Sequence, residues 1–216
     1  MVDSPAPAPP EPWNHNSHYH RVVLAAVPDR CDSALDVGCG TGRLTRELRR
    51  VIPRVTGIDR DEQSITVARA RDRAGDIEYR CGDFLDLPLR PGGFGLITAV
   101  ASLHHMSAAA ALNRMREQLR PGGALVIIGL ARDGWSPRDL ALELPAVVGH
   151  RVQRFRHRSG PRTGGSAPAS GYQPPVVWPP AETYQQVRRL AGTLLPGMRY
   201  RRHLLWRYSI CWVKPG

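Results

Sequence analysis

Three glycines at alternate positions, Gly38, Gly40 and Gly42, follow an apolar run and constrain the fold more than any other feature of this chain. The run, Ala34-Leu-Asp-Val37, predicts a buried strand, and a helical pattern extends from Arg43 to about Val51. A strand, a glycine loop and a helix in this order leave bare backbone that a ligand can approach, with the helix N-terminus facing it. The sequence therefore predicts a ligand-binding loop between the first strand and the first core helix.

The spacing of these glycines distinguishes the loop from a dinucleotide-binding site. Nicotinamide and flavin dinucleotides are bound by the pattern G-x-G-x-x-G, in which the third glycine stands three residues after the second. Here Arg43 occupies that position, the third glycine comes one residue early, and the acidic Asp36 precedes the first glycine. The loop is therefore not expected to hold a dinucleotide.

The segments downstream alternate short apolar strands with helical patterns, which predicts a parallel α/β sheet. Each expected strand is followed by polar residues, which parallel strands bring to one edge of a sheet. Asp59 follows the second strand, Asp83 the third, and the pair His104–His105 the fourth. The expected strands are 55–58, 77–80, 94–100 and, after a Pro-Gly-Gly turn, 124–128, with helices beginning near Asp61 and Met106.

Together these motifs resemble those of class I S-adenosylmethionine (SAM)-dependent methyltransferases, whose first motif usually reads D/E-x-G-x-G-x-G. The resemblance covers Ser33 to Gly129 continuously, and is strongest to small-molecule enzymes related to ubiquinone/menaquinone C-methyltransferases. It implies an enzyme of the EC 2.1.1 class that uses SAM and releases S-adenosylhomocysteine. It also implies a doubly wound, Rossmann-like sheet of seven strands, mostly parallel, with a C-terminal antiparallel hairpin formed by 198–205 and 206–213.

The resemblance also assigns the cofactor-binding residues. Asp36 and the loop 38–42 are expected to hold the methionine part of SAM, and Asp59 its ribose hydroxyls. Asp83 is expected to accept from the adenine amine, with Phe84 or the neighbouring glycine backbone against the ring. The predicted cofactor-binding set is Asp36, Gly38, Cys39, Gly40, Gly42, Asp59, Arg60, Gly82, Asp83, Phe84 and Ala99.

Each of these acids also has a purely structural interpretation. Asp36 could only cap the loop, because short acidic side chains readily bond to nearby backbone. Asp59 could cap the next helix, although Asp61 is also placed to do so. Asp83 could be a surface turn residue. Cys39 is interpreted as a small packing side chain and not as a nucleophile.

His104 and His105 stand where the fourth strand opens onto the expected cleft, and they are the candidate catalytic residues. Methyl transfer from a sulfonium is an in-line displacement, so a base is needed only for a hydroxyl, an ammonium or a weakly acidic carbon. The imidazole pKa suits such a base. Because adjacent residues diverge, only one of the pair is expected to face the acceptor. The alternative is that the pair merely lines the donor pocket.

The segment 13–20 precedes the core and is expected to start a helix that ends near Val27, and the resemblance implies that this helix folds over the cleft as a lid. Aromatic rings there could cover the sulfonium by cation–π contact. One alternative is a helix with solvated histidines. Another is a metal held by His15 and His18 at helical spacing, but no further ligand completes such a set, so no metal is predicted. The predicted substrate-facing residues of the lid are Trp13, His15, His18, Tyr19 and His20.

One domain is predicted, because 216 residues suffice for one sizeable core and are too few for two. Residues 1–12 are proline-rich and are expected to be a disordered tail, followed by the lid helix at 13–32. The methyltransferase domain is expected to span 33–216, with a variable insertion at about 132–180 that begins with a helix and continues as a Gly/Pro/Ser-rich loop.

The net charge of +11 comes from an excess of arginine, since Lys214 is the only lysine among 30 basic residues. Basic charge favours nonspecific contact with nucleic acid, so an RNA methyltransferase is one alternative function, although nucleic acid is not the expected partner. A catalytically inactive, SAM-binding interaction module is another. The Asn/Asp-Pro-Pro-Tyr/Phe motif of enzymes that methylate DNA bases is absent after the fourth strand, which counts against that substrate.

No apolar run approaches the ~18 residues of a membrane span, and no basic-then-apolar signal sequence begins the chain. The four cysteines are scattered and form no C-x-x-C pair, as suits a reducing compartment. A cytoplasmic protein without a membrane partner is expected. The sequence predicts neither the acceptor nor the oligomeric state.

Overall fold

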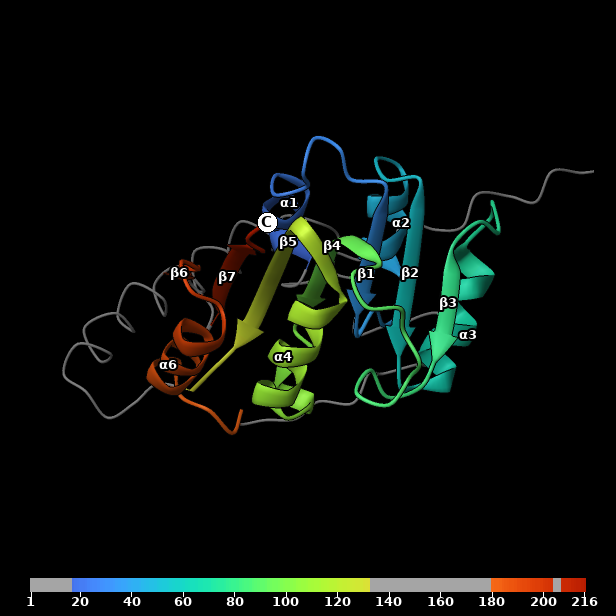
Figure 1. Cartoon of the computed structure of the whole chain (residues 1–216). Coiled ribbons are helices and arrows are strands. Elements are labelled where there is room, and N and C mark those ends of the chain that lie inside the picture. The colour runs from blue at the N-terminus through green and yellow to red at the C-terminus, as the bar shows by residue number, and fades with distance from the viewer. Residues whose placement is uncertain (1–16, 133–179, 204–206) are drawn as a thin grey trace, which may run out of the picture.

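The computed structural model describes residues 17–132, 180–203 and 207–216. Its centre is a seven-stranded sheet of order β3-β2-β1-β4-β5-β7-β6 (Figure 1). The first five strands in that order are parallel, and β7 pairs antiparallel with both β5 and β6. This confirms the predicted doubly wound sheet with its C-terminal hairpin. The strands are β1 (Ser33–Val37), β2 (Arg54–Asp59), β3 (Glu78–Cys81), β4 (Phe94–Val100), β5 (Leu119–Leu130), β6 (Arg199–Arg202) and β7 (Arg207–Val213).

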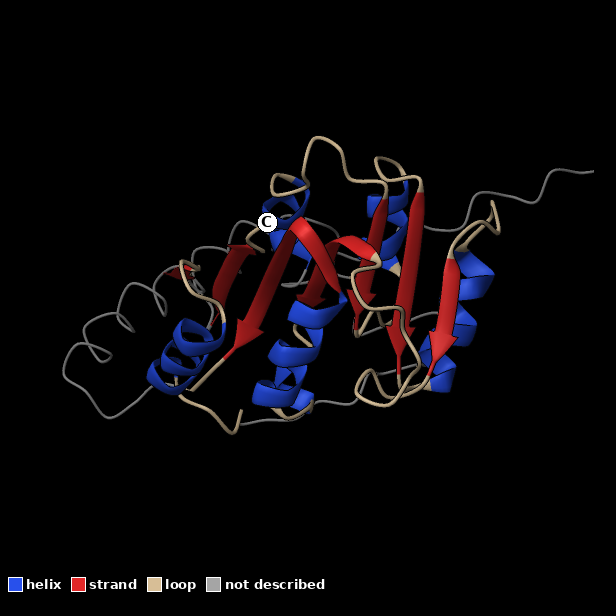
Figure 2. Cartoon of the chain, in the orientation of Figure 1, coloured by secondary structure: helices blue, strands red, loops and turns tan. Residues whose placement is uncertain are grey.

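Helices cover both faces of the sheet (Figure 2). The α-helices α4 and α6 pack on one face, where Leu35 and Val37 of β1 also point. The helices α1 and α2 pack on the other, together with Ala34. This alternation follows from the two-residue period of a strand. The helices are η1 (Ser17–Tyr19), α1 (His20–Leu24), α2 (Arg43–Arg49), α3 (Glu62–Arg71), η2 (Leu103–His105), α4 (Ala108–Gln118) and α6 (Tyr184–Leu194).

The position of β1 determines where a ligand can bind. It lies between β2 and β4, so the chain winds to one side of β1 through β2 and β3 and to the other side through β4 and β5. In open α/β sheets a crevice forms at such a switch point, outside the carboxyl ends of the strands. The glycine loop and the segments after β2, β3 and β4 all leave the sheet at this edge.

Some element boundaries differ from the predicted ones. The first helix ends at Leu24 and not near Val27, because after the α-helical bond from the Ala25 amide to the Arg21 carbonyl the next two amides bond only three residues back. Strand β5 begins at Leu119, so the predicted Pro-Gly-Gly turn becomes an irregular start of the strand. Strand β6 ends at Arg202 and is shorter than the expected 198–205, because His203 is no longer in a strand.

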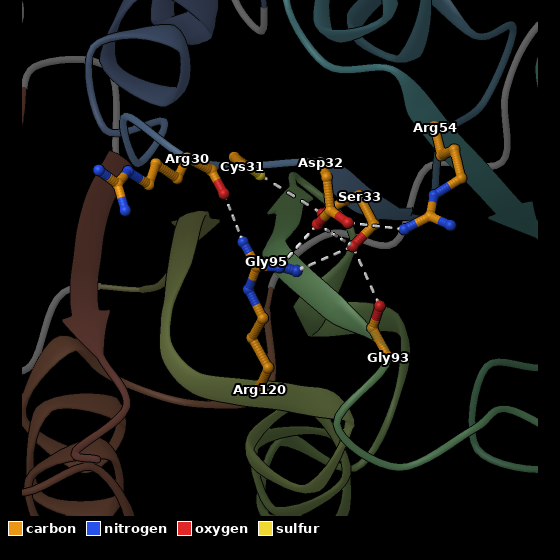
Figure 3. A network of polar contacts seen from close by, with 8 residues as sticks. All are labelled: Arg30, Cys31, Asp32, Ser33, Arg54, Gly93, Gly95 and Arg120. Atoms are coloured by element: carbon orange, nitrogen blue, oxygen red, sulfur yellow. Dashed lines mark hydrogen bonds and ion pairs between the residues drawn. The ribbon is translucent and has the colours of Figure 1, made fainter.

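The opposite, amino edge of the sheet is held by a polar network (Figure 3). Asp32 pairs with Arg54 and with Arg120, each at 2.7 Å, and the Ser33 hydroxyl donates to the Gly93 carbonyl at 3.0 Å. Partial burial pushes the pKa of Asp32 upward, but the hydrogen bond from Ser33 and the two guanidinium groups outweigh it and lower that pKa. The network therefore ties the starts of β1, β2, β4 and β5 together.

Several predictions concern residues outside the described ranges. The tail 1–12, the lid residues Trp13 and His15, and positions 133–179 of the insertion fall there, so the domain boundaries remain predictions. Among the helices that the structure describes, none combines the length and apolar character needed to cross a membrane.

Candidate cofactor and active site

The glycine loop leaves β1 in a shape that other residues rarely adopt. Gly38, Gly40 and Gly42 have φ angles of 72°, 53° and 75°, all in the left-handed region. The amides of Gly38 and Cys39 both donate to the Ile58 carbonyl of β2, at 2.8 and 2.9 Å. Helix α2 begins directly after Gly42. The loop is thus fixed between β2 and α2.

The three glycines differ in what surrounds them. A Cβ added at Gly38 would lie 2.2 Å from the Cβ of Ser102, and one at Gly42 would lie 2.4 Å from the hydroxyl oxygen of Tyr79. A Cβ at Gly40 would meet no protein atom within 4 Å. Gly38 and Gly42 therefore allow the loop to pack closely, whereas Gly40 borders open space, as expected where a ligand approaches bare backbone.

Asp59, the last residue of β2, is bonded to this open part of the loop. Its Oδ2 accepts from the Gly40 amide at 2.8 Å, and its Oδ1 from the Asp61 amide at 3.0 Å. Asp61 itself caps α3, because its side chain accepts from the Ser64 amide at 2.7 Å. The helix cap is thus supplied by Asp61, and the partly exposed Asp59 carboxylate keeps lone pairs for vicinal hydroxyl donors.

Asp36 points into the layer of α1 and α2 and is 2% exposed. Its Oδ2 accepts from the Thr45 hydroxyl at 2.8 Å, and its Oδ1 from the Thr98 hydroxyl at 2.9 Å. Alternation along β1 turns Asp36 to the same face as Ala34. The register of β1 with β4 then places Thr98 beside it. Burial raises the pKa of its carboxyl group, against the effect of the two threonines. This arrangement favours support of the loop, and direct contact with a methionine amino group stays a prediction.

The turn after β3 carries the residues predicted to contact adenine. Asp83 is exposed, and its Oδ1 accepts from the Leu85 amide at 2.8 Å, which closes a local turn and leaves the second oxygen outside that turn. Phe84 is 2% exposed, and the guanidinium carbon of Arg114 lies 5.5 Å from its ring centroid. The Phe84 ring therefore packs in the core, whereas Asp83 and the Gly82 backbone stay accessible.

The other three predicted cofactor residues lie in different environments. Cys39 is 9% exposed and packs with Ile65 and Tyr79, and burial raises its pKa, which supports a packing role. Ala99 is fully buried in β4, so its side chain contacts the core. Arg60 is exposed directly after β2.

A left-handed turn follows β4. Ala101 has a φ of 55°, and among the described residues no other non-glycine residue has a positive φ. Its amide donates to the Ile128 carbonyl at 2.7 Å, and the next residue, Ser102, donates its hydroxyl to the Val37 carbonyl at 2.6 Å. The turn therefore brings the exit of β4 over the end of β1. Sequence reasoning missed it, because alanine carries no turn signal.

The same turn continues into η2 and brings the two histidines together. The ring centroids of His104 and His105 are 4.1 Å apart, with the rings tilted by 37°. The prediction that these side chains diverge is wrong, because they follow a 3-10 turn and not an extended strand. Within the described residues, the Nδ1 atom of each is buried without a hydrogen-bond partner.

The electrostatic surroundings of the two imidazoles differ. Burial, together with His105 and Arg207, lowers the pKa of His104 to about 4. Burial and Arg60 also lower the pKa of His105, and the Asp59 carboxylate opposes this. Both rings are therefore neutral at pH 7 and can accept a proton. His105 is influenced by the end of β2, whereas His104 is influenced by the start of β7.

Of the predicted lid residues that the structure describes, Tyr19 and His20 are buried and His18 is half-buried. Tyr19 is 5% exposed, and its ring centroid lies 5.1 Å from that of His18 and 5.3 Å from that of His203. His20 is 7% exposed, with its Nδ1 2.9 Å from Oε2 of Glu47 in α2. The alternative of solvated histidines is wrong for His20, because its imidazole is paired in the layer between α1 and α2.

Two comparisons with known proteins decide the family. Residues 35–127 match a family described as a methyltransferase domain. An uncharacterized methyltransferase of Mycobacterium tuberculosis is 31% identical over 212 residues, which cover 95% of this chain and 98% of the relative. The chain belongs to the methyltransferase family. The span matched by the family runs from β1 to β5 and thus contains the glycine loop, the three acids and the histidine pair.

This methyltransferase is also similar to other named proteins. It is 38% identical to the O-methyltransferase cnsE of Penicillium expansum over 152 residues, which cover 64% of this chain and 55% of that protein. Phosphoethanolamine N-methyltransferase 2 of Haemonchus contortus, solved in complex with SAM, superposes with a TM-score of 0.62 at 14% identity. The match covers 92% of this chain and 53% of that one. At that identity the similarity shows a shared fold.

Proposed function

We propose that the protein binds SAM and transfers its methyl group to a small-molecule acceptor, with S-adenosylhomocysteine as the second product. The observation that carries this proposal is the open backbone at Gly40, bonded to the Asp59 carboxylate, at the same sheet edge as a pair of neutral imidazoles. The SAM complex of the Haemonchus contortus protein, which shares the fold, supports the choice of cofactor. Kinship with ubiquinone/menaquinone C-methyltransferases stays a prediction.

The chain's own residues divide the work of binding. Asp59 accepts hydrogen bonds from the ribose hydroxyls, and the bare backbone of Gly40 lies against the methionine part. Asp83 and the Gly82 backbone contact the adenine. When bound, SAM supplies an electrophilic methyl carbon on a positively charged sulfur. The protein holds the acceptor in line with that carbon and excludes water, and such orientation is worth ~7–11 kcal/mol of barrier.

The acceptor atom in this proposal is a hydroxyl oxygen. The similar Penicillium expansum protein is named an O-methyltransferase, and a neutral imidazole can take the hydroxyl proton on its unprotonated ring nitrogen. Of the two rings, His105 is the better base, because the Asp59 carboxylate opposes the lowering of its pKa, whereas the pKa of His104 falls to about 4.

Two measurements test this function. Calorimetry on the full chain should show binding of SAM and S-adenosylhomocysteine. Turnover with methyl-labelled SAM should then appear on a panel of small phenols and alcohols and not on the corresponding amines. SAM binding without turnover on any acceptor would support an inactive interaction module. Tight RNA binding at physiological salt in a filter assay, with methyl incorporation into RNA, would support an RNA methyltransferase.

Replacement of each histidine tests the assignment of the base. His105→Ala should lose most of the turnover while its SAM affinity stays near that of the wild type, and His104→Ala should lose less. An unperturbed imidazole titrates at ~6.5; because the pKa of His105 is lowered, wild-type turnover should decline at a lower pH than that. If both variants kept full activity, neither histidine would act as the base.

A further inference from the structure

His20 joins the N-terminal helix to the helix that follows the glycine loop. It is the first residue of α1 and is 7% exposed, and its Nδ1 lies 2.9 Å from Oε2 of Glu47. The Glu47 side chain, 27% exposed, also faces Arg43 Nε one helical turn earlier, at 3.6 Å. Glu47 is therefore contacted by a buried imidazole from α1 and by an arginine of its own helix, α2.

Helix α2 connects this contact to the loop. It begins directly after Gly42, and its residue Thr45 donates to the buried carboxylate of Asp36. His20 also interacts electrostatically with Asp36. The imidazole thus lies near two carboxylates, Glu47 of α2 and Asp36 of β1.

The residue before His20 makes a second connection. Tyr19 is 5% exposed and contacts His203, which follows β6. The two consecutive side chains therefore reach both halves of the sheet, His20 toward the glycine loop and Tyr19 toward the hairpin. Tyr19 and His20 therefore connect the N-terminal helix to α2 on one side of β1 and to the hairpin on the other.

We propose that His20 is a positioning residue for the cofactor site: through Glu47 it holds α2, and with it the glycine loop, in the shape that binds SAM. Docking of the N-terminal helix and SAM affinity are then coupled, although no atom of His20 touches the cofactor. This inference rests on the proposed function, because it concerns the same SAM site.

Three variants of the full chain test the coupling. His20→Leu removes the contact with Glu47, whereas His20→Asn keeps a donor close to the position of Nδ1. Val23→Ala is the matched control, because Val23 is fully buried in the same helix, packs in the apolar core and has no polar atom that could bond to Glu47. SAM affinity is measured by calorimetry, and thermal unfolding is measured without ligand.

His20→Leu should weaken SAM binding about tenfold and raise the KM for SAM, with kcat retained at saturating SAM. His20→Asn should restore affinity to within about threefold of the wild type. Val23→Ala should lower the unfolding temperature and leave SAM affinity within about twofold. This pattern separates positioning from stability, because the control loses stability without losing affinity.

Either of two results would overturn the proposal: wild-type SAM affinity in folded His20→Leu, or an equal loss of affinity in Val23→Ala. If His20→Leu does not fold, Glu47→Gln decides, because that side chain is partly exposed; it should weaken SAM binding, and unchanged affinity would refute the coupling. Failure of the wild type itself to bind SAM would instead refute the proposed function.

Discussion

Replacement of Gly40 by alanine should separate ligand contact from backbone strain. Gly40 has a φ of 53° and Gly75, in the turn before β3, a φ of 65°, and a Cβ at either position would meet nothing within 4 Å. Left-handed backbone costs a non-glycine residue roughly 1–2 kcal/mol. Both variants should therefore unfold roughly 2–8 °C lower, since 1 kcal/mol is worth about 2–4 °C at this chain length.

The two variants should differ in SAM binding, because only the methyl group at Gly40 enters the space proposed for SAM. We expect at least tenfold weaker binding by calorimetry for Gly40→Ala, or ~1.4 kcal/mol, and wild-type affinity for Gly75→Ala. SAM at 100 times the wild-type Kd should stabilise the wild type and Gly75→Ala by ~2.7 kcal/mol, and Gly40→Ala by at most ~1.4 kcal/mol. Equal SAM affinity of the two variants would show that the open space at Gly40 is not the cofactor site.

Three single side chains give the remaining predictions. Asp59→Ala should weaken SAM binding by about 1–3 kcal/mol, as expected when charged hydrogen bonds are lost; an effect on acceptor affinity alone would contradict the ribose assignment. Ala101→Gly should stabilise the fold by about 1 kcal/mol in urea unfolding, because glycine relieves the left-handed strain; a lower midpoint would refute this. Asp32 has a lowered pKa beside Arg54 and Arg120, so its contribution to stability is present above the ordinary carboxyl pKa and is lost as the pH falls through the lowered value. Asp32→Asn should therefore flatten the loss of stability in acid, measured by urea midpoints, and an unchanged acid slope would argue against it.

The order of strands, the loop and the acids at the strand ends could be predicted because each depends on local pattern. Short apolar runs bounded by glycine give the strands, and parallel strands bring the residues after them to one edge of the sheet. The role of Asp61 as the cap of α3 was also accessible, because a short acid directly before a helix is a common cap.

The direction of the Asp36 side chain could not be predicted in the same way. Its partner Thr98 is 62 residues away, and the pair meets only because β1 and β4 are neighbours in a particular register. The histidine pair was mispredicted for a related reason. Its geometry depends on the left-handed Ala101, and an alanine gives no sign in the sequence that the strand ends there in a turn.

The polar network around Asp32 stands at the opposite end of the strands from the glycine loop. Changes at the carboxyl edge therefore do not touch the contacts that hold the strand starts together. For laboratory evolution this is an advantage, since a library restricted to exposed residues after the strand ends leaves the ion pairs and hydrogen bonds of the strand starts intact while it searches for new acceptors. The same separation would let duplicated copies of such a gene diverge in specificity while they keep the contacts of the strand starts.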